Sequence, residues 1–531
     1  MNYGIYGGAF DPFHTGHLSV IRGALKSNKI DKLLIIPTGI PAIKSSRNLS
    51  LPPYRYYMVS KAVKNIERCE VSSVEFTMMK PSYTIDTINS LLKSGQIEES
   101  DRLYLVCGSD LLYEFDKWRQ PEMLLGKVSL LVAKRPGNDE SGILLAAKNI
   151  FEKYGAVIEF FETDAVDISS TEVRSSHDFS LLPIEVQEFI NKHDLYPEDR
   201  PLDSLSDASF MALSQYSMKL FCELSEKRLL HSLNTAVLSV RYALRFGYDP
   251  NQAAIAGLLH DCAKELPAED QKKFASEVLT GKLPGKEMIH APAGVKCALQ
   301  SYGISDNIIL DAINYHTTGR SKMTGIEKIV YLADKLEPAR DYDDLNEIRR
   351  QVEIDLNCAM IECLTAVKDS LNRKGLLFHD QSSDALEELK KLKNETTNKE
   401  ERMNSKELSE KITEILENKK AIDVEILPVA EKTIIADYFI VASGSSTTHI
   451  KALADEVAFV LKDELKISTD HIEGFSTGRW ILMDYKDVIV HLFHPEEREN
   501  YSLEKLWSAR PADITIFVPE TENIPAETKP D

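Results

Sequence analysis

Two polar stretches divide the 531-residue sequence into three segments. The first, "YPEDRPLDSLSD" (196–207), is rich in proline and acidic residues, and the second, "KKLKNETTNKEERMNSKE" (390–407), has no apolar stripe. At roughly 100 to 200 residues per domain, a chain of this length forms about three domains, each large enough to bury its own core. We therefore expect domains at 1–197, 205–390 and 405–515, followed by an acidic disordered tail at 516–531.

The hydrophobic pattern predicts a different fold class for each segment. Strand-like and helix-like runs alternate in the first, which indicates a Rossmann-like α/β domain with a parallel sheet and crossover helices. The second has helical periodicity almost throughout, with Asp249 as a predicted N-cap and Pro250 at the first helical position, so we expect an all-α domain. The third mixes helices and strands, which predicts an α+β domain.

The composition indicates in which compartment the chain functions and which classes of partner it can bind. The sequence has no apolar window of about 18 residues and begins with a strand-like run, so we expect neither a membrane span nor a secretory signal. Seven scattered cysteines, without the paired spacing of a zinc site, fit a reducing compartment such as the cytoplasm. With 63 basic and 83 acidic residues the net charge is −20, which argues against direct binding of DNA or other nucleic acid by the whole chain.

The stretch "YGGAFDPFHTGHL" (6–18) has the residues of a phosphate site. Gly7 and Gly8 follow a predicted strand and let the backbone approach phosphate closely, whereas His14 and His17 lie at the start of the next helix, which favours negative charge. The motifs GxGxxG and GxxxxGK[ST] are absent, which disfavours a dinucleotide-binding oxidoreductase and a P-loop enzyme. A histidine pair alone is equally consistent with an ordinary strand-to-helix turn.

A second stretch, "ISSTEVRSS" (168–176), supports the phosphate interpretation. It places hydroxyl groups and Arg174 at a predicted helix start, where they can bind the β and γ phosphates of a nucleotide. Together the two stretches resemble the HxGH nucleotidyltransferase superfamily. Residues 1–197 are further similar to nicotinate-nucleotide adenylyltransferases, through "PTGIPAIK", "PSYTIDTI", "GSD", Trp118, "KRPG" and "INKHDLYP".

That resemblance implies transfer of an adenylyl group from ATP, with Mg²⁺, to the phosphate of nicotinate mononucleotide, with release of pyrophosphate. His14 and His17 would stabilise the transferring phosphoryl group, and Arg174 the leaving pyrophosphate. The family usually has a histidine before the lysine that binds the mononucleotide phosphate, where this sequence has Ile43. The expected ATP-binding residues are Gly7, Gly8, Ser169, Ser170, Thr171 and Arg174, and the expected substrate-binding residues are Lys44, Thr84, Asp110, Arg135 and Trp118, the last by stacking on the pyridine ring.

In the second segment, "AAIAGLLHDCAK" (253–264) is an apolar helical run that ends in His260 and Asp261. An isolated His-Asp pair is more often structural than metal-binding. Here, however, four histidines and two aspartates lie on separate predicted helices of one domain. Such a set can hold two transition-metal ions, iron or manganese, with one bridging carboxylate. The predicted ligands are His231, His260, Asp261, His290, His316 and Asp334.

The motifs "HDCAKE", "HAPAG", "YHTTGR" and "ADKLEPAR" resemble the HD phosphohydrolase superfamily and, within it, the HD-type symmetrical diadenosine tetraphosphate hydrolases. The resemblance implies that a metal-activated water attacks a phosphate and gives two ADP, with Asp261 and Lys264 as catalytic residues. Lys264, Arg320 and Arg340 are candidate phosphate clamps. The motif identifies the type of reaction more specifically than the substrate. Another nucleotide, such as a guanosine tetraphosphate alarmone, is therefore an alternative substrate.

The third segment has a Gly-Ser pair after a predicted strand, as nucleotidyltransferases do, but its next acids, Asp455 and Glu456, are adjacent on a helix and unsuited to hold magnesium. We expect no catalysis there. Residues 473–507 resemble the iojap-like ribosomal silencing factors, which implies binding to a protein on the intersubunit face of the large ribosomal subunit and a block of subunit joining.

Charge favours a protein partner over RNA, because residues 401–531 hold 15 Lys and Arg against 26 Asp and Glu, a net charge of −11. Trp480, Tyr501 and Trp507 form the candidate contact patch, although each alone is more often a core residue than a binding hot spot. The sequence thus predicts a fusion of three functions. The alternative is a ribosome-associated regulator whose first two domains sense nucleotides without turnover.

Overall fold

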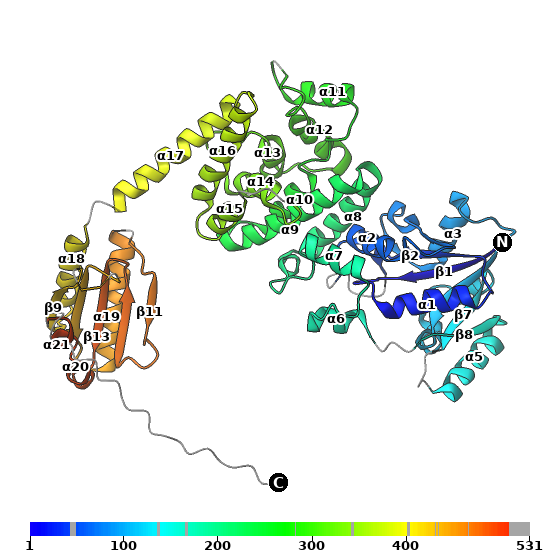
Figure 1. Ribbon diagram of the computed structural model, residues 1–531, viewed down its shortest axis with the longest axis horizontal. Coiled ribbons are helices and arrows are strands. Elements are labelled where there is room, and N and C mark those ends of the chain that lie inside the picture. The colour runs from blue at the N-terminus through cyan, green and yellow to red at the C-terminus, as the bar shows by residue number, and fades with distance from the viewer. Residues whose placement is uncertain are drawn as a thin grey trace, which may run out of the picture. The chain divides into compact units, whose positions relative to one another are not determined.

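The computed structural model describes residues 1–42, 49–134, 139–164, 168–281, 283–340, 345–400, 404–430, 432–433, 435–465 and 467–508. These residues belong to two compact units, Met1–Lys390 and Lys391–Asp531 (Figure 1). The predicted acidic tail, 516–531, lies outside the described residues. No described helix is both long and apolar enough to cross a lipid bilayer.

The first unit begins with a six-stranded, wholly parallel sheet in the order β4-β2-β1-β6-β7-β8. The order reverses at β1, and ligands of open α/β sheets bind beside the carboxyl ends of the strands at such a reversal. Gly7 and Gly8 lie at that end of β1. The strands are β1 (Asn2–Gly8), β2 (Lys32–Pro37), β4 (Cys69–Val71), β6 (Arg102–Gly108), β7 (Val128–Lys134) and β8 (Ile158–Glu162), and β3 (Ile40–Pro41) pairs separately with β5 (Pro81–Ser82).

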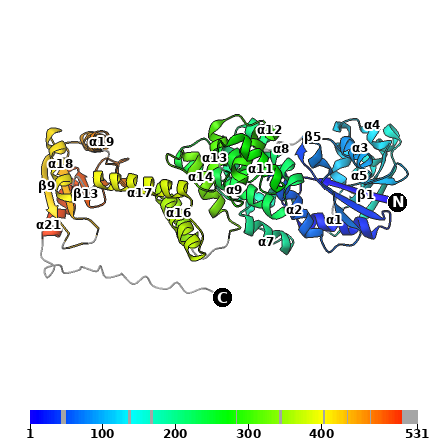
Figure 2. The same ribbon diagram turned by 90° about the horizontal axis from the view of Figure 1, so that it is seen from above.

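Helices cover both faces of this sheet, which explains why its strands are almost continuously apolar. Figure 2 shows α3 and α4 on one side of β1 and α1 and α2 on the other. Each side has its own core cluster. The predicted Rossmann-like α/β fold is confirmed. The helices are α1 (Thr15–Lys26), α2 (Pro52–Val63), α6 (Ser170–Ser176) and α7 (Ile184–His193) on one side, and α3 (Thr84–Ser94), α4 (Pro121–Leu125) and α5 (Glu140–Tyr154) on the other.

The rest of the first unit is helical, as predicted. Asp249 caps α10 by accepting the backbone N–H of Asn251, and Pro250 is the first residue of that helix, so the predicted start is confirmed. The helices are α8 (Asp207–Glu223), α9 (Glu226–Phe246), α10 (Pro250–Leu259), α11 (Ala268–Val278), α12 (His290–Tyr302), α13 (Asn307–Tyr315), α14 (Gly325–Leu336), α15 (Leu345–Val352), α16 (Leu356–Arg373) and α17 (Asp380–Glu400), of which the part up to Lys390 belongs to this unit.

The α/β part and the helical part share one hydrophobic core within this unit. Phe221 of α8 lies between Tyr56 and Phe76, with ring centroids 4.7 and 4.9 Å apart. Lys61 of α2 pairs with Glu226 of α9 at 3.1 Å. We keep the names first domain and helical domain for residues 1–197 and 205–390, because the boundary between them remains a prediction from the sequence.

The second unit, here called the third domain, has a mixed five-stranded sheet in the order β11-β12-β13-β10-β9, in which β10 and β13 are parallel. Helices α18 and α19 pack on one face, which confirms the predicted α+β fold. Gly474 has φ 75°, and a Cβ there would meet the Trp480 carbonyl oxygen at 1.8 Å, so glycine is required. The elements are α18 (Ser405–Asn418), β9 (Ile422–Pro428), β10 (Tyr438–Ser443), α19 (Thr447–Glu464), β11 (His471–Glu473), β12 (Trp480–Asp484), β13 (Val488–Phe493), α20 (Pro495–Tyr501) and α21 (Leu503–Ser508).

Candidate active sites

The two histidines of the first motif lie together at the start of α1. His14 is the N-cap residue, its backbone N–H donates to Nδ1 of His17 at 3.1 Å, and the two rings stack with centroids 3.6 Å apart. Gly16 fits between His14 and Ile168, because a Cβ there would lie 3.0 Å from the His14 ring and 3.1 Å from the Ile168 side chain. Both imidazoles are thus fixed at the helix N-terminus, beside the switch point of the sheet, where negative charge is favoured.

The second motif meets the first although some 160 residues separate them. The Arg174 guanidinium donates to the carbonyl oxygen of Asp11 and lies 3.8 Å from its carboxylate. The Ser170 hydroxyl donates to the Pro12 carbonyl oxygen at 3.0 Å. Ser169 caps α6 and Thr171 accepts a hydrogen bond from Arg174 at 3.4 Å. The structure therefore brings the predicted ATP-binding residues of both motifs into one site.

Two buried residues that the sequence analysis missed hold this site in place. The Asp11 carboxylate, which is 1% exposed, accepts hydrogen bonds from the hydroxyl of Tyr196 at 2.7 Å and from the backbone N–H of Ser50 at 3.0 Å. The Arg55 guanidinium, also 1% exposed, donates to the carbonyl oxygens of Ala9, Gly39 and Ser50 at 2.8 to 3.0 Å. Asp11 stands inside the motif "FDPFH" and could have been selected for that reason, whereas nothing near Arg55 in the sequence indicates its role.

The predicted substrate residues are dispersed around the same sheet. Thr84 begins α3, and exposed Asp110 follows β6. Trp118 is half-buried and stacks on Phe115 with centroids 5.2 Å apart, so one face of its ring is covered. Stacking of a pyridine ring on Trp118 stays a prediction. Lys44, its neighbour Ile43, and Arg135 lie outside the described residues.

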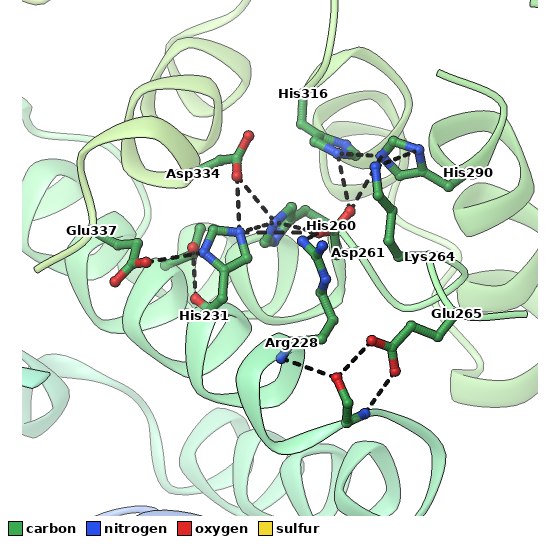
Figure 3. A network of polar contacts seen from close by, with 12 residues as sticks. Arg228, His231, His260, Asp261, Lys264, Glu265, His290, His316, Asp334 and Glu337 are labelled. Carbon is green, nitrogen blue, oxygen red and sulfur yellow. Dashed lines mark hydrogen bonds and ion pairs between the residues drawn. The ribbon is translucent and has the colours of Figure 1, made fainter. Parts of the chain in front are cut away.

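All six predicted metal ligands converge in the helical domain (Figure 3). Five helices supply them: α9 carries His231, α10 ends before His260 and Asp261, α12 begins with His290, α13 ends before His316, and α14 carries Asp334. Every one of these side chains is buried.

Asp261 belongs to two ligand triplets at once. Its Oδ2 faces Nε2 of His260 at 3.6 Å and of His231 at 4.0 Å. Its Oδ1 faces Nε2 of His290 at 3.2 Å and of His316 at 3.5 Å. Within each triplet the potential ligand atoms all lie within 4.8 Å of one another. A single carboxylate with one oxygen in each triplet is what a bridging ligand between two ions requires.

The hydrogen bonds behind the histidines fix which ring nitrogen faces the cage. Nδ1 of His260 and Nδ1 of His316 each lie 2.7 Å from a backbone carbonyl oxygen, to which they donate, and Nδ1 of His231 donates to Glu337 at 3.2 Å. In a neutral imidazole, Nε2 then keeps its lone pair for a metal. Burial lowers the pKa of His290, and that of His316 to about 4, which favours this neutral form.

The donor set fits a pair of divalent transition-metal ions. Imidazole nitrogens and carboxylate oxygens suit such ions. The buried Oδ1 of Asp261 accepts no hydrogen bond from any described residue, and a metal ion would satisfy this oxygen. Although burial opposes ionisation, His260, His290 and His316 hold the pKa of Asp261 well below its usual range, so the carboxylate is charged and ready to bind cations.

Basic side chains surround the cage, and the sequence analysis missed one of them. Lys264 Nζ lies 3.1 Å from the His290 ring, and burial lowers the pKa of this lysine. Arg340 lies 3.3 Å from Asp334. Arg228, which was not predicted, donates to Oδ2 of Asp261 at 2.5 Å. It precedes His231 by three residues, a spacing that places both on one helix face and could have revealed it.

Arg320, a predicted phosphate clamp, forms ion pairs with two carboxylates. Its guanidinium donates twice to Glu327, at 2.8 Å each, and once to Asp311 at 2.9 Å. Glu327 is buried and also accepts the Thr324 backbone N–H at the start of α14. These contacts stabilise the start of α14, and the clamp role stays a prediction.

The aromatic residues of the third domain lie beside β13. Trp480 packs against Phe493 and Tyr501, with centroids 4.9 and 4.8 Å apart, and Trp507 meets Phe439 edge-on at 5.2 Å. Tyr501 is 54% exposed, whereas Trp480 and Trp507 are half-buried. The candidate contact patch is thus an aromatic cluster with an exposed tyrosine.

Three family models match the chain: cytidylyltransferase-like at residues 5–176, HD domain at 228–339, and ribosomal silencing factor during starvation at 402–531. The chain is 28% identical over 340 residues to a probable nicotinate-nucleotide adenylyltransferase/Ap4A hydrolase of Mycoplasma pneumoniae, covering 64% of this chain and 90% of that protein.

Two further relatives each match one domain. A probable nicotinate-nucleotide adenylyltransferase of Clostridium tetani is 34% identical over 197 residues, 36% of this chain and 97% of that protein. A symmetrical bis(5'-nucleosyl)-tetraphosphatase of Bacillus subtilis is 39% identical over 145 residues, 27% of this chain and 78% of that protein. The chain is therefore an enzyme that belongs to the nicotinate-nucleotide adenylyltransferase family through its first domain and to the HD-type symmetrical bis(5'-nucleosyl)-tetraphosphatases through its helical domain, joined to a ribosomal silencing factor domain.

Proposed function

We propose that this chain catalyses two reactions. At the first site it transfers an adenylyl group from ATP to nicotinate mononucleotide, and at the second it hydrolyses diadenosine tetraphosphate to two ADP. The observation that carries the proposal is the shared Asp261, whose two oxygens each face a histidine pair in a buried cage. Arg174 binds the loop that precedes His14 and His17, and this contact supports the adenylyl transfer at the first site.

The first reaction needs positioning and charge stabilisation more than covalent help from the protein. An oxygen of the mononucleotide phosphate attacks the α-phosphorus of ATP, and the bond to the β-phosphate breaks, so pyrophosphate leaves. His14 and His17 donate hydrogen bonds to the transferring group, and Arg174 binds the leaving pyrophosphate. The substrate is ATP as its magnesium complex. Asp11 and Arg55 keep these donors preorganised, and preorganised donors are the main source of such catalysis.

In the second reaction, water adds to one of the two inner phosphorus atoms, the central P–O–P bridge breaks, and each half leaves as ADP. His231, His260, Asp261 and Asp334 would hold one divalent ion, and Asp261, His290 and His316 the other; we propose iron or manganese. Such an ion pair supplies Lewis acidity toward phosphate oxygens and water. Lys264, Arg228 and Arg340 bind phosphate oxygens at the rim of the cage, and the clamp role of Arg320 requires release from its carboxylate partners.

We further propose that the third domain binds a protein on the intersubunit face of the large ribosomal subunit and blocks subunit joining, in the cytoplasm where the nucleotide substrates occur. The family match over residues 402–531 supports this role. The acidic charge of that segment disfavours rRNA, and the exposed edge of the aromatic cluster at Tyr501 offers an anchor for a protein.

Product analysis of the purified chain tests the enzymatic proposal. We expect pyrophosphate only when ATP and nicotinate mononucleotide are both present, and ADP as the sole product from diadenosine tetraphosphate with Mn²⁺. ATP plus AMP would contradict symmetrical cleavage. Faster turnover of guanosine tetraphosphate would assign the cage to alarmones. Nucleotide binding without any product would instead favour the alternative of a ribosome-associated nucleotide sensor.

A further inference from the structure

Each ligand triplet of the metal cage has an open pocket beside it. The pocket at Lys264 and His290 has a volume of about 400 Å³ and is formed within the helical domain. The pocket at His231 and Arg340 has a volume of about 1020 Å³. Volumes of several hundred cubic ångströms suit ligands of nucleotide size.

The larger pocket, here called the interdomain pocket, has walls from both domains of the first unit. Helix α9, with Arg228 and His231, and the segment directly after α14, with Arg340, contribute the side that belongs to the helical domain. The other side comes from α2 and α7 of the first domain and from Lys64, which follows α2 directly. A metal ligand and the surface of the adenylyltransferase domain therefore line the same space.

The first domain adds positive charge to this pocket. Lys61 is held by its ion pair with Glu226 at 3.1 Å, across the domain boundary. Lys64 and Lys192 are exposed and form no ion pair with any residue that the structure describes. Arg228 and Arg340 bring further positive charge beside the metal ligands. The acidic residues of the wall, Glu185, Glu188, Glu226 and Glu337, do not outnumber its basic residues.

We propose that the interdomain pocket is one of two nucleoside diphosphate subsites of the hydrolase and that the first domain builds half of it. The inference rests on the proposed symmetrical cleavage. When the central bridge of a dinucleoside tetraphosphate lies on the cage, a nucleoside diphosphate must extend from it on each side. Lys64 and Lys192 attract the phosphates of one half, while the pocket at Lys264 receives the other half.

The packing between the two domains keeps this subsite formed. The shared core, the Lys61–Glu226 pair and the hydrogen bond from Tyr54 to Asn234 at 2.7 Å fix α2 and α7 against α9. The helical domain therefore depends on the first domain for substrate affinity, although the metal ligands are all its own. Fusion of the two domains therefore increases the affinity of the hydrolase for its substrate.

Charge reversal in the full chain tests the proposal. The double variant Lys64→Glu/Lys192→Glu should raise KM for diadenosine tetraphosphate about tenfold or more, because a contact with a charged partner contributes roughly that factor. The kcat of hydrolysis and the rate of adenylyl transfer should stay within about twofold, since neither lysine touches the cage or the first site. Lys64→Arg/Lys192→Arg should keep the wild-type KM. The matched control is Lys93→Glu/Lys148→Glu, which reverses two exposed lysines on α3 and α5 across the sheet and should not change KM.

Photolabelling gives a readout that needs no turnover. A non-hydrolysable, methylene-bridged diadenosine tetraphosphate with azido-adenine bases should label peptides of α2 or α7 as well as peptides of α11 or α12. The Glu variant should lose the α2 and α7 labels alone. An unchanged KM together with labels confined to the helical domain would overturn the subsite. If the wild-type chain does not hydrolyse diadenosine tetraphosphate, the proposed function fails, and the labels still decide whether the pocket binds a dinucleotide.

Discussion

Tyr54 of the first domain donates its hydroxyl hydrogen to Oδ1 of Asn234 in the helical domain, at 2.7 Å. Asn234 in turn donates to Glu337 at 2.7 Å, and Glu337 accepts from Nδ1 of the predicted metal ligand His231 at 3.2 Å. A continuous chain of hydrogen bonds thus runs from the adenylyltransferase domain to the metal cage. Partners behind a ligand fix its orientation and basicity.

Glu337→Gln should weaken the cage without unfolding the protein. The amide can still accept from His231 but lacks the negative charge, so we expect metal affinity or hydrolysis to fall by about 10-fold to 100-fold. Tyr54→Phe, two hydrogen bonds further away, should have a smaller effect in the same direction. Metal content after dialysis and the rate of ADP formation measure both variants. A loss that is larger in Tyr54→Phe than in Glu337→Gln would contradict the proposed chain.

Metal affinity should fall as the pH is lowered. Burial lowers the pKa of His231, but the hydrogen bonds that its ring donates to Asp334 and Glu337 outweigh this effect and raise the pKa above its usual value. Protons therefore compete with the metal below that raised pKa, and the competition ends above it. The stability of the metal-free protein should depend on pH in the opposite direction. The protonated histidine stabilises the fold at low pH, and this stabilisation is lost as the pH rises through the raised pKa. Calorimetric Mn²⁺ titrations between pH 6 and 8 check the first trend.

The third domain should lose stability in mild acid. Burial lowers the pKa of His491 to about 4 from 6.5, so the unfolded chain binds a proton that the folded domain excludes between these values. The free energy of unfolding should therefore fall by roughly 3 kcal/mol as the pH drops through this window. His491→Phe removes the titrating group and should flatten the dependence. Denaturant unfolding of residues 391–531 at several pH values measures it, and equal slopes in both proteins would exclude His491 as the cause.

His17→Ala should lower adenylyl transfer by about 10² to 10³, the loss typical of one preorganised transition-state donor. Hydrolysis of diadenosine tetraphosphate and ribosome binding should be unchanged, because the residue touches neither site. Pyrophosphate release is the measurement. Turnover near that of the wild type would remove His17 from the catalytic residues.

Tyr501→Ala should weaken co-sedimentation of the chain with large ribosomal subunits. Tyr501 is 54% exposed, so its loss should remove a contact and leave the fold intact. Phe459→Ala is the matched control, because Phe459 is 64% exposed on α19, which packs on the other face of the sheet. Equal binding to both subunits, or aggregation of the Tyr501 variant, would contradict a role for this residue as a contact with the large subunit.

Local sequence patterns predicted the three fold classes and selected all six residues that converge in the cage. They succeeded because hydrophobic periodicity and short motifs are local properties. Arg228 and Glu337 were missed although each stands three residues from a predicted ligand, because a basic or acidic residue on a helix is usually solvent-exposed.

Contacts between distant segments could not be predicted in the same way. The shared core at Phe221 and Phe76 depends on how two domains pack, which periodicity does not encode. Lys64, Lys192 and His231 line one pocket only after three separate helices have assembled. The pairing of Arg320 with Glu327 and Asp311 could not be predicted from its motif either, and its role as a phosphate clamp stays a prediction.

The most direct test of the two-ion cage compares metal content and products in the wild type and in Asp261→Ala. We predict two transition-metal ions per wild-type chain and ADP as the sole product from diadenosine tetraphosphate. Asp261→Ala should lose both ions and all hydrolysis, because one carboxylate serves both triplets, while its adenylyl transfer stays at the wild-type rate. A variant that keeps hydrolytic activity, or a wild-type chain that binds no transition metal and releases no ADP when metal is supplied, would contradict the account.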